Sequence, residues 1–233
     1  PTEEYTVAEF RRAYAAALDE IAGRRHRALL VGGTGLYHRV VIDEFDLPGQ
    51  WPDVRSDLDA VEDTAALFEK LRRVDPLATT KMEPTNRRRI LRALEVTVGS
   101  GRPFSSFGPG VDSYPPSDIV QIGLRWPRDV ITERIADRVD QMLADGLIDE
   151  VSALAPAGLS RTASQALGYR EVLEMLAGRM SREQTVEAIV LHTRQFAVRQ
   201  ERWFRRDPRV RWLDIERDAV EEAAPAVIEA LTA

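Results

Sequence analysis

A glycine-rich turn, Gly32-Gly33-Thr34-Gly35, is the segment of this 233-residue chain best suited to chemistry. It follows a short apolar run and precedes a predicted helix that begins near Leu36, so its N–H groups would lie at the positive end of a helix dipole, where diphosphate binds. Thr34 adds a hydroxyl. The same residues also suit a purely structural turn whose glycines permit positive φ. The turn is not a Walker P-loop, because no lysine follows it and the pattern G-x-x-x-x-G-K-S/T is absent.

Two further segments concentrate positive charge. Four arginines lie between Arg87 and Arg92, on barely two helical turns, and residues 194–206 alternate arginines with Phe196, Trp203 and Phe204. Such an arginine cluster is typical of phosphate-backbone binding, although a solvated surface paired with acidic residues has the same composition. We interpret the aromatic residues as core anchors rather than as base-stacking platforms.

Two weaker patterns involve single arginines. Arg134 and Arg138 are four residues apart on a predicted helix, so they share a face and could clamp a diphosphate, with Glu133 and Asp137 as alternative partners. Residues 165–170, Gln-Ala-Leu-Gly-Tyr-Arg, place a glycine among planar polar side chains at a predicted helix start, which could contact a phosphate.

Composition excludes several classes of protein. With 44% hydrophobic and 30% charged residues the chain can form a globular core, and the absence of cysteine excludes disulfides, thiolate metal sites and cysteine nucleophiles. His26, His38 and His192 are too far apart for a helical metal pair. The net charge is −6, but the basic residues are concentrated in two patches within an otherwise acidic chain. No apolar run approaches the roughly 20 residues of a membrane span, so we expect a cytoplasmic protein with no membrane partner.

Helices and strands alternate among the elements predicted to position these residues. Thr6 and Glu9 form a capping box for a helix to about residue 23, and Ser181 with Gln184 forms another for a helix toward residue 206. The apolar run 28–31 predicts a strand buried on both faces, and further strands are predicted at 119–124 and 209–213. A helix is predicted between Pro127 and residue 146. This order predicts an α/β core.

About seventy residues between the first two predicted strands show no strand pattern. Thr64 is predicted to cap one helix, and Asn86 to cap another that runs through residue 98 and is closed by Gly99-Ser100-Gly101. We therefore predict a core formed by residues 1–46 and 117–233, with a helical insertion at 47–116. Because so few helices bury little surface alone, the insertion should rest on the core or on a partner.

In order along the chain, these segments resemble the bacterial tRNA dimethylallyltransferase (tRNA isopentenylpyrophosphate transferase) family. The similar stretches are YTVAEF (5–10), LVGGTGLY (30–37), DP (75–76), RRRILRALEV (87–96), QML (141–143), GYR (168–170) and HTRQFAVRQERWFR (192–205). The resemblance implies a P-loop-NTPase-like parallel sheet with a helical tRNA-binding insertion. It also implies transfer of a dimethylallyl group from dimethylallyl diphosphate to N6 of adenosine 37 in tRNA, with Mg²⁺.

The resemblance assigns residues to this reaction. Thr34 would be catalytic, and the substrate diphosphate would contact Gly32, Gly33, Thr34 and Arg138. The anticodon stem-loop would contact two sets of residues, Arg88, Arg89, Ile90, Leu91 and Arg92, and Gln165, Ala166, Leu167, Gly168, Tyr169 and Arg170. We expect a monomer and no metal ligand within this chain.

The sequence departs from the family pattern at one point. The family's P-loop and its general-base aspartate precede the position that matches Pro1, so we expect a truncated chain that lacks its first strand and is inactive alone. Two other functions stay open at this stage. One is a prenyltransferase acting on free adenine nucleotide, against which the arginine-rich insertion argues, and the other is a non-catalytic RNA-binding fragment.

Overall fold

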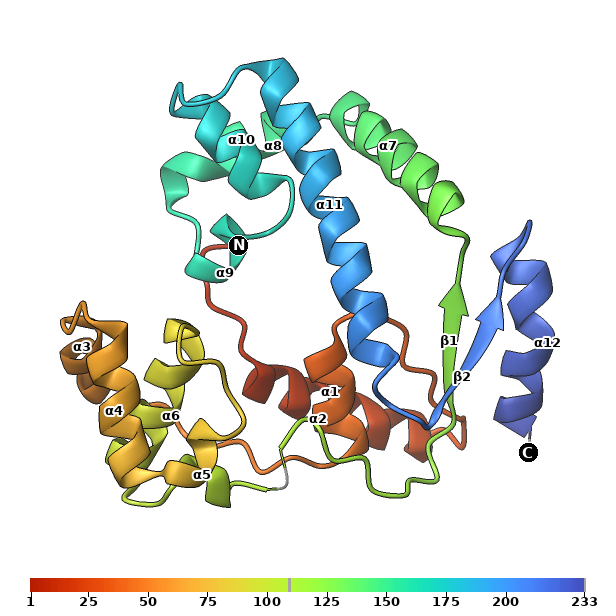
Figure 1. Cartoon of the computed structure of the whole chain (residues 1–233). Coiled ribbons are helices and arrows are strands. Elements are labelled where there is room, and N and C mark those ends of the chain that lie inside the picture. The colour runs from red at the N-terminus through yellow and green to blue at the C-terminus, as the bar shows by residue number, and fades with distance from the viewer. Residues whose placement is uncertain (109, 233) are drawn as a thin grey trace. The chain divides into compact units, whose positions relative to one another are not determined.

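The computed structural model describes residues 1–108 and 110–232, which divide into two compact units (Figure 1). Unit 1 contains Pro1–His38 and Pro116–Ala233, and unit 2 contains Arg39–Pro115. The boundaries drawn from the sequence were 47 and 116. No helix in the described part of the chain is long and apolar enough to cross a lipid bilayer.

Unit 1 combines helices with a small sheet. Its elements are α1 (Val7–Gly23), α2 (Gly35–Ile42, which continues into unit 2), β1 (Gln121–Arg125), α7 (Arg128–Ala144), α8 (Leu147–Leu154), the 3-10 turn η2 (Ala155–Ala157), α9 (Arg161–Ser164), α10 (Tyr169–Leu176), α11 (Arg182–Phe204), β2 (Val210–Asp214) and α12 (Ala219–Thr232). Both predicted capping boxes are confirmed, at Thr6 with Glu9 and at Ser181 with Gln184.

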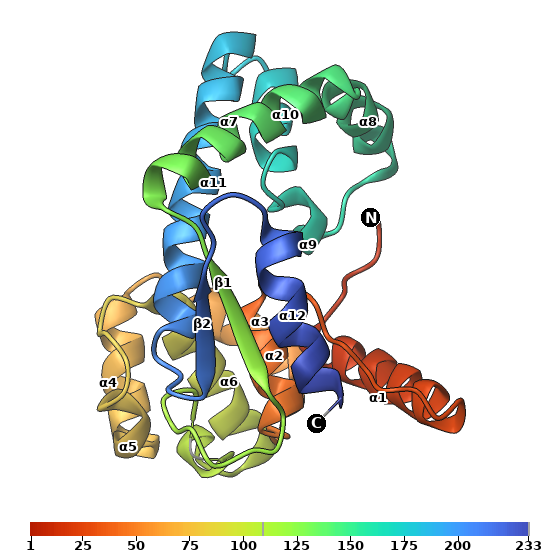
Figure 2. The same ribbon diagram turned by 90° about the vertical axis from the view of Figure 1, so that its right-hand side faces the viewer.

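The two strands pair in parallel, with Gln121 opposite Val210 and Arg125 opposite Asp214 (Figure 2). Arg125 and Asp214 close the end of the pair through two hydrogen bonds of 2.5 and 2.9 Å. Helix α12 packs against β1. Both strands lie within two residues of their predicted positions, and the parallel pairing fits the expected α/β class.

The strand predicted at 28–31 is wrong for the described residues, whose sheet consists of β1 and β2. Leu29 and Val31 are 59% and 81% exposed, so the run is not covered on both faces. A strand exists only through hydrogen bonds to a neighbouring strand, and no described strand pairs with this run. Its apolar residues therefore indicate what could be buried and do not by themselves form a strand.

The helical core of unit 1 lies among α7, α8, α10 and α11. Its buried residues are Val139, Leu147, Val151, Val172 and Ile189. This core holds α11 against α7 and α10.

Unit 2 is helical, as expected for the insertion. It contains α3 (Pro52–Asp59), α4 (Thr64–Val74), α5 (Pro76–Thr79), α6 (Arg87–Ser100) and the 3-10 turn η1 (Phe104–Ser106). The α4 cap is Asp63 and not Thr64, because the Asp63 carboxylate accepts the Ala65 N–H at 2.8 Å. Asn86 caps α6 as predicted, and Gly101 ends it with a left-handed φ of 70°. Its core contains Leu67, Leu71, Ile90, Leu91 and Leu94.

Candidate active site and nucleic-acid interface

The glycine turn at 32–35 leads directly into α2, which begins at Gly35, one residue earlier than expected. The Thr34 carbonyl accepts hydrogen bonds from the N–H groups of Tyr37 and His38, at 2.9 and 3.2 Å, so Thr34 occupies the start of the helix. Its side chain is exposed. The turn therefore presents a hydroxyl to solvent beside the first N–H groups of a helix, which have no partner within the helix itself.

Close packing, and not positive φ, explains the glycine at position 35 of this turn. None of its glycines has positive φ among the described residues, which rules out that interpretation of the turn. A Cβ on Gly35 would lie 2.1 Å from the Trp203 indole, and a Cβ on Gly33 would lie 2.2 Å from Gln200 Nε2. At Gly35 the neighbour is a rigid ring, so only a residue without a side chain fits there. At Gly33 the neighbour is the flexible end of the Gln200 side chain, which a Cβ would have to displace.

Helix α11 holds the turn through its last two turns. Gln200 Nε2 donates to the Gly33 carbonyl at 2.9 Å, and His38 Nε2 donates to the Gly32 carbonyl at 3.0 Å. The Phe204 ring meets the His38 ring edge-on at 5.4 Å between centroids. Burial lowers the pKa of His38, and the bond to the Gly32 carbonyl opposes this in part. A neutral imidazole donating from Nε2 matches this arrangement.

Two of the three aromatic residues of α11 serve as anchors. Trp203 and Phe204 are partly buried against the glycine turn and His38. Phe196 is 38% exposed, so its prediction as a core anchor is wrong. It lies two turns before Trp203 along α11, and the Arg199 guanidinium carbon lies 5.9 Å from the centre of its ring.

The arginine pair on α7 is divided between two roles. Arg134 stacks over the Trp126 ring at 4.4 Å, which occupies the face predicted to clamp a diphosphate. Arg138 is exposed, and no hydrogen bond or ion pair among the described residues links it to the glycine turn. Both arginines are exposed, so the two-arginine clamp stays a prediction, in which Arg134 would have to bind its ligand beside Trp126.

The arginines of α6 differ in what they contact. Arg87 donates to the carbonyls of Glu62 and Asp59, each at 3.1 Å. Arg92 donates to Glu95 at 2.7 Å and to the carbonyls of Pro48 and Gly49 at 2.8 and 3.0 Å. Both guanidinium groups thus hold neighbouring segments of unit 2. Arg92, which we expected to contact tRNA, instead donates its hydrogen bonds to groups of its own chain.

Two residues of the predicted tRNA-binding stretch point into the protein. Ile90 and Leu91 are 0% and 2% exposed and belong to the core of unit 2. Their side chains are packing residues, which corrects the expectation that they touch tRNA. The 3.6-residue period of α6 separates them from the cationic face.

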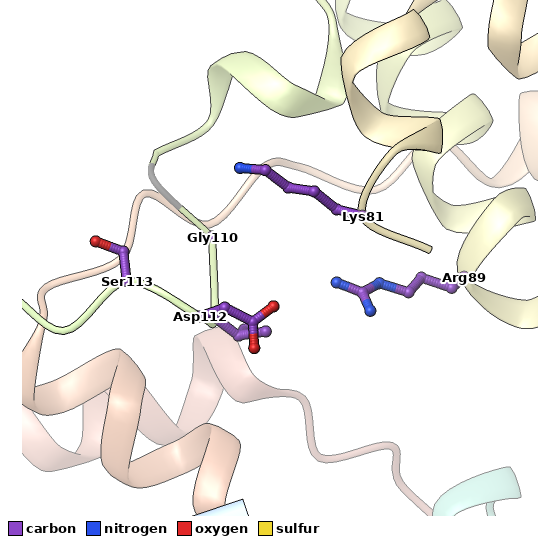
Figure 3. A pocket seen from close by; sticks show the side chains of 6 residues that line it. Lys81, Arg89, Gly110, Asp112 and Ser113 are labelled. Atoms are coloured by element: carbon purple, nitrogen blue, oxygen red, sulfur yellow. The ribbon is translucent and has the colours of Figure 1, made fainter. Parts of the chain in front are cut away.

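Arg88 and Arg89 remain accessible. Arg88 is exposed, and Arg89 borders a hollow with Lys81 and residues 110–113 (Figure 3). No ion pair among the described residues engages Arg88, Arg89 or Lys81. Asp112 shares the hollow, so its charge is mixed, with two cations and one carboxylate. Arg88, Arg89 and Lys81 are therefore open to a ligand, and all three lie in the basic stretch that the sequence shows between Lys81 and Arg102.

The stretch 165–170 forms a turn between two short helices. Ser160 caps α9, and Gly168 takes a φ of 92° immediately before α10, a conformation that favours glycine. Gln165 and Ala166 are exposed, Leu167, Tyr169 and Arg170 are partly buried, and Gly168 is buried. The Tyr169 hydroxyl donates to Glu150. Only the first two residues of this stretch are fully open to a ligand.

A buried carboxylate fixes this turn to α11. Glu171, 2% exposed, accepts hydrogen bonds from the Gly168 N–H at 2.9 Å and from Arg170 at 2.6 Å, and it lies 2.8 Å from His192 Nδ1. Burial by itself would raise the pKa of Glu171. The hydrogen bonds from Arg170, the Gly168 N–H and His192 outweigh it and hold the pKa below its usual value.

Helix α11 brings two of the predicted sites together within unit 1. Gln200, Trp203 and Phe204 hold the glycine turn, and His192 holds the Gly168 turn. Eight residues separate His192 from Gln200, which is about 12 Å along a helix axis. Gln200, His38 and Glu171 were not predicted as site residues. The contacts that tie each of them to the site, with Gly33, Phe204 and His192 respectively, join residues distant in sequence, although the HTRQFAVRQERWFR stretch contains Gln200.

The described residues offer no gathered metal ligands. Nowhere within residues 1–108 and 110–232 do three His, Asp or Glu side chains lie close enough to hold an ion. The described residues therefore form no Mg²⁺ site built from protein ligands alone.

The sequence is similar to those of known tRNA-modifying enzymes. The sequence is 47% identical over 235 residues to the tRNA dimethylallyltransferase of Thermobifida fusca, covering 98% of this chain and 73% of the relative. It is 47% identical over 218 residues to that of Salinispora tropica, covering 91% and 68%.

Solved structures extend this likeness to the fold. The full-length tRNA isopentenylpyrophosphate transferase of Bacillus halodurans superposes with a TM-score of 0.66 at 34% identity, covering 100% of this chain and 76% of that one. A eukaryotic dimethylallyltransferase acting on tRNA superposes with a TM-score of 0.75 at 22% identity, covering 97% and 61%, which shows the shared fold. A family model described as IPP transferase matches residues 1–207, and the chain belongs to this family.

Proposed function

We propose that the protein transfers a dimethylallyl group from dimethylallyl diphosphate to N6 of adenosine 37 in tRNA. The observation that carries the proposal is membership of the IPP transferase family, with relatives at 47% identity that are named tRNA dimethylallyltransferase. The two alternatives raised by the sequence, a free adenine nucleotide as acceptor and a fragment without catalysis, gain no support from these relatives.

The reaction forms one bond and breaks one. The N6 nitrogen of adenine attacks C1 of the dimethylallyl group, the C1–O bond to the diphosphate breaks, and the proton of N6 passes to a base. Because an aromatic amine is a weak nucleophile, most of the rate must come from stabilising negative charge on the departing diphosphate and from holding the two reactants in line.

In this proposal the glycine turn acts on the departing diphosphate. The exposed Thr34 hydroxyl and the first N–H groups of α2 are donors whose positions are fixed by Gln200 and Trp203. Fixed donors need no reorganisation as charge develops, which is how such groups lower a barrier. Arg138 would add a positive charge from α7. Diphosphate in solution carries Mg²⁺, which we retain as a proposed cofactor.

The tRNA would be bound through its phosphates by Arg88 and Arg89 of unit 2. Both are accessible and lack an intramolecular ion pair among the described residues, whereas Arg87 and Arg92 are engaged. The exposed Gln165 and Ala166 of unit 1 would contact the same RNA. We propose the anticodon stem-loop as the element bound, a monomer as the working form, and the cytoplasm as its location.

Labelled dimethylallyl diphosphate, Mg²⁺ and unmodified tRNA test this proposal. The protein is assayed with tRNA and free adenosine monophosphate present together as competing acceptors. We expect label in adenosine 37 of tRNA and none in the free adenosine monophosphate. Label in the free nucleotide, or none in any RNA, would overturn the proposal.

A further inference from the structure

A hollow in unit 2 is lined by cations from two segments of the chain and by residues of a third segment. Lys81 follows α5, Arg89 lies in the first turn of α6, and residues 110–113 follow η1. The side chains of Lys81 and Arg89 extend toward residues 110–113 (Figure 3), and neither side chain makes a hydrogen bond or an ion pair with another described residue. The residues that line the hollow all lie between Arg39 and Pro115, so the hollow belongs to one compact unit.

A buried arginine holds the segment 110–113 in place. Arg39 is 3% exposed, and it donates from one terminal nitrogen to the Val111 carbonyl at 2.8 Å and from the other to the Ser113 carbonyl. Its Nε donates to Asp43. Burying an arginine is costly unless its charge and its N–H groups find partners, and here two of those partners are backbone oxygens of the hollow's wall. Two carbonyl oxygens that would repel an anion are thereby bound to a cation.

A buried carboxylate links the segments that lead into the hollow. Asp75 is 1% exposed and caps α5 by accepting the Ala78 N–H at 3.0 Å. The same carboxylate accepts the Ser105 N–H at 2.8 Å and the Ser105 hydroxyl at 2.7 Å. Ser105 belongs to η1, which precedes residues 110–113, and α5 precedes Lys81. The two segments are therefore joined close to their starts by one buried charge.

The charges that line the hollow suit a phosphate group. Arginine binds phosphate oxygens with a planar fork of donors, and lysine binds them as a point charge. The Asp112 carboxylate borders the same hollow, so two cations and one carboxylate give the lining residues a net charge of +1, which falls to zero if either cation is lost. A phosphodiester of an RNA backbone carries one negative charge and matches this value, whereas a free diphosphate carries more.

We propose that this hollow is a phosphate-binding site in which Lys81 and Arg89 hold one phosphate group between them. The phosphate comes from the backbone of a bound RNA or from a free diphosphate, and the net charge of the lining residues favours the backbone. Only the RNA source rests on the proposed function, in which unit 2 binds tRNA. Lys81 and Arg89 thus act as one contact, whereas Arg88, which does not line the hollow, would act as another.

The two lysines of the chain, Lys70 and Lys81, allow a direct test. Both are exposed and both lie in unit 2, so Lys70 is an internal control. Acetylation of the 233-residue protein is followed by mass spectrometry without ligand, with inorganic diphosphate, and with an anticodon stem-loop RNA. A phosphate in the hollow should slow acetylation of Lys81 in proportion to the occupied fraction and leave Lys70 unchanged. Protection by only one of the two ligands identifies the source of the phosphate. Equal rates at Lys81 with and without both ligands, or equal protection of both lysines, would overturn the inference.

Where the RNA protects Lys81, the salt dependence of RNA binding tests whether the two cations share one phosphate. Lys81→Gln should flatten the slope of log affinity against log salt by about 0.7–0.9, as one lost phosphate contact does. Adding Arg89→Gln should flatten it no further, because the lining residues have already lost their net positive charge. Lys70→Gln is the matched control and should keep the wild-type slope.

A variant of opposite effect protects the test against misfolding. Asp112→Asn should strengthen RNA binding up to about fivefold, because two like charges in contact in water repel each other by roughly that factor. A wild-type slope in Lys81→Gln, additive changes in the double variant, or no gain in Asp112→Asn would overturn the inference. If the protein binds no RNA, the proposed function fails, and protection of Lys81 by diphosphate still decides whether the hollow binds phosphate.

Discussion

Replacing Gly35 by alanine should slow prenyl transfer more than any other single-methyl change in the glycine turn. The added Cβ would lie 2.1 to 2.7 Å from three atoms of the Trp203 indole, a rigid ring at the end of α11. Alanine on Gly32 is the matched control, since its Cβ would meet only His38 Nε2, at an ordinary 3.6 Å.

The magnitude follows from two opposing effects on stability. Forcing a methyl into a packed contact typically costs about 1–3 kcal/mol, whereas alanine gains up to about 1 kcal/mol over glycine inside a helix. We expect Gly35→Ala to be destabilised by about 1–2 kcal/mol in net. If the strain moves Thr34 by about 1 Å, kcat should fall roughly ten- to a hundredfold.

Denaturant unfolding and single-turnover prenyl transfer measure the two effects separately. Trp203→Leu combined with Gly35→Ala should recover part of the loss in both, because removing the ring removes the clash. A coupling of at least about 1 kcal/mol between the two sites is expected for residues in direct contact. Equal behaviour of Gly35→Ala and Gly32→Ala, or strictly additive effects of Gly35→Ala and Trp203→Leu, would refute the packing argument.

Three further changes test other parts of the site. Thr34→Ala should lower kcat roughly ten- to a thousandfold and leave tRNA affinity unchanged, as expected for the loss of a single transition-state donor. Single-turnover rates measure the first effect and filter binding the second, and Thr34→Ser is the control that keeps the hydroxyl. Arg88→Gln with Arg89→Gln should flatten the salt dependence of tRNA binding by about 1.5 in log–log slope, at about 0.7–0.9 per lost phosphate contact, and a slope equal to wild type would show that neither arginine meets a phosphate. Glu171→Gln should cost about 2–4 kcal/mol at pH 7, since it weakens a buried hydrogen-bonded charge. Because the folded pKa of Glu171 is lowered, its stabilising contribution is present above the unfolded value near 4.5 and is lost as the pH falls through the folded pKa, so wild type and variant should converge in unfolding free energy under acid conditions.

Local features of the fold could be predicted from the sequence. The caps at Thr6, Asn86 and Ser181 depend on residues three positions away, and all three form as expected. The run at 28–31 failed because strand formation depends on a distant neighbour that local composition does not reveal. The caps were therefore predictable because their hydrogen bonds are short in sequence, whereas apolar runs predicted strands correctly at β1 and β2 and wrongly at 28–31.

The candidate site was less predictable for the same reason. The sequence distinguishes the cationic face of α6 from its core face, but it cannot tell that Arg92 is engaged by carbonyls 43 and 44 residues away, or that Arg39 is buried by residues 72 and 74 positions on. In a chain with 30 arginines, composition does not indicate which arginines hold the fold together. Only the folded arrangement separates arginines that bind the protein from those left for a ligand.

The contact between the glycine turn and α11 has a consequence for synthesis on the ribosome. Gln200 and Gly33 are 167 residues apart in sequence, so the turn waits about 8 to 33 s for its partner at about 5–20 residues per second. The helices of unit 2 contact one another within residues 39–115 and can pack during that interval. The insertion that would hold tRNA is thus completed early in translation, and Thr34 reaches its final position only after α11 has emerged.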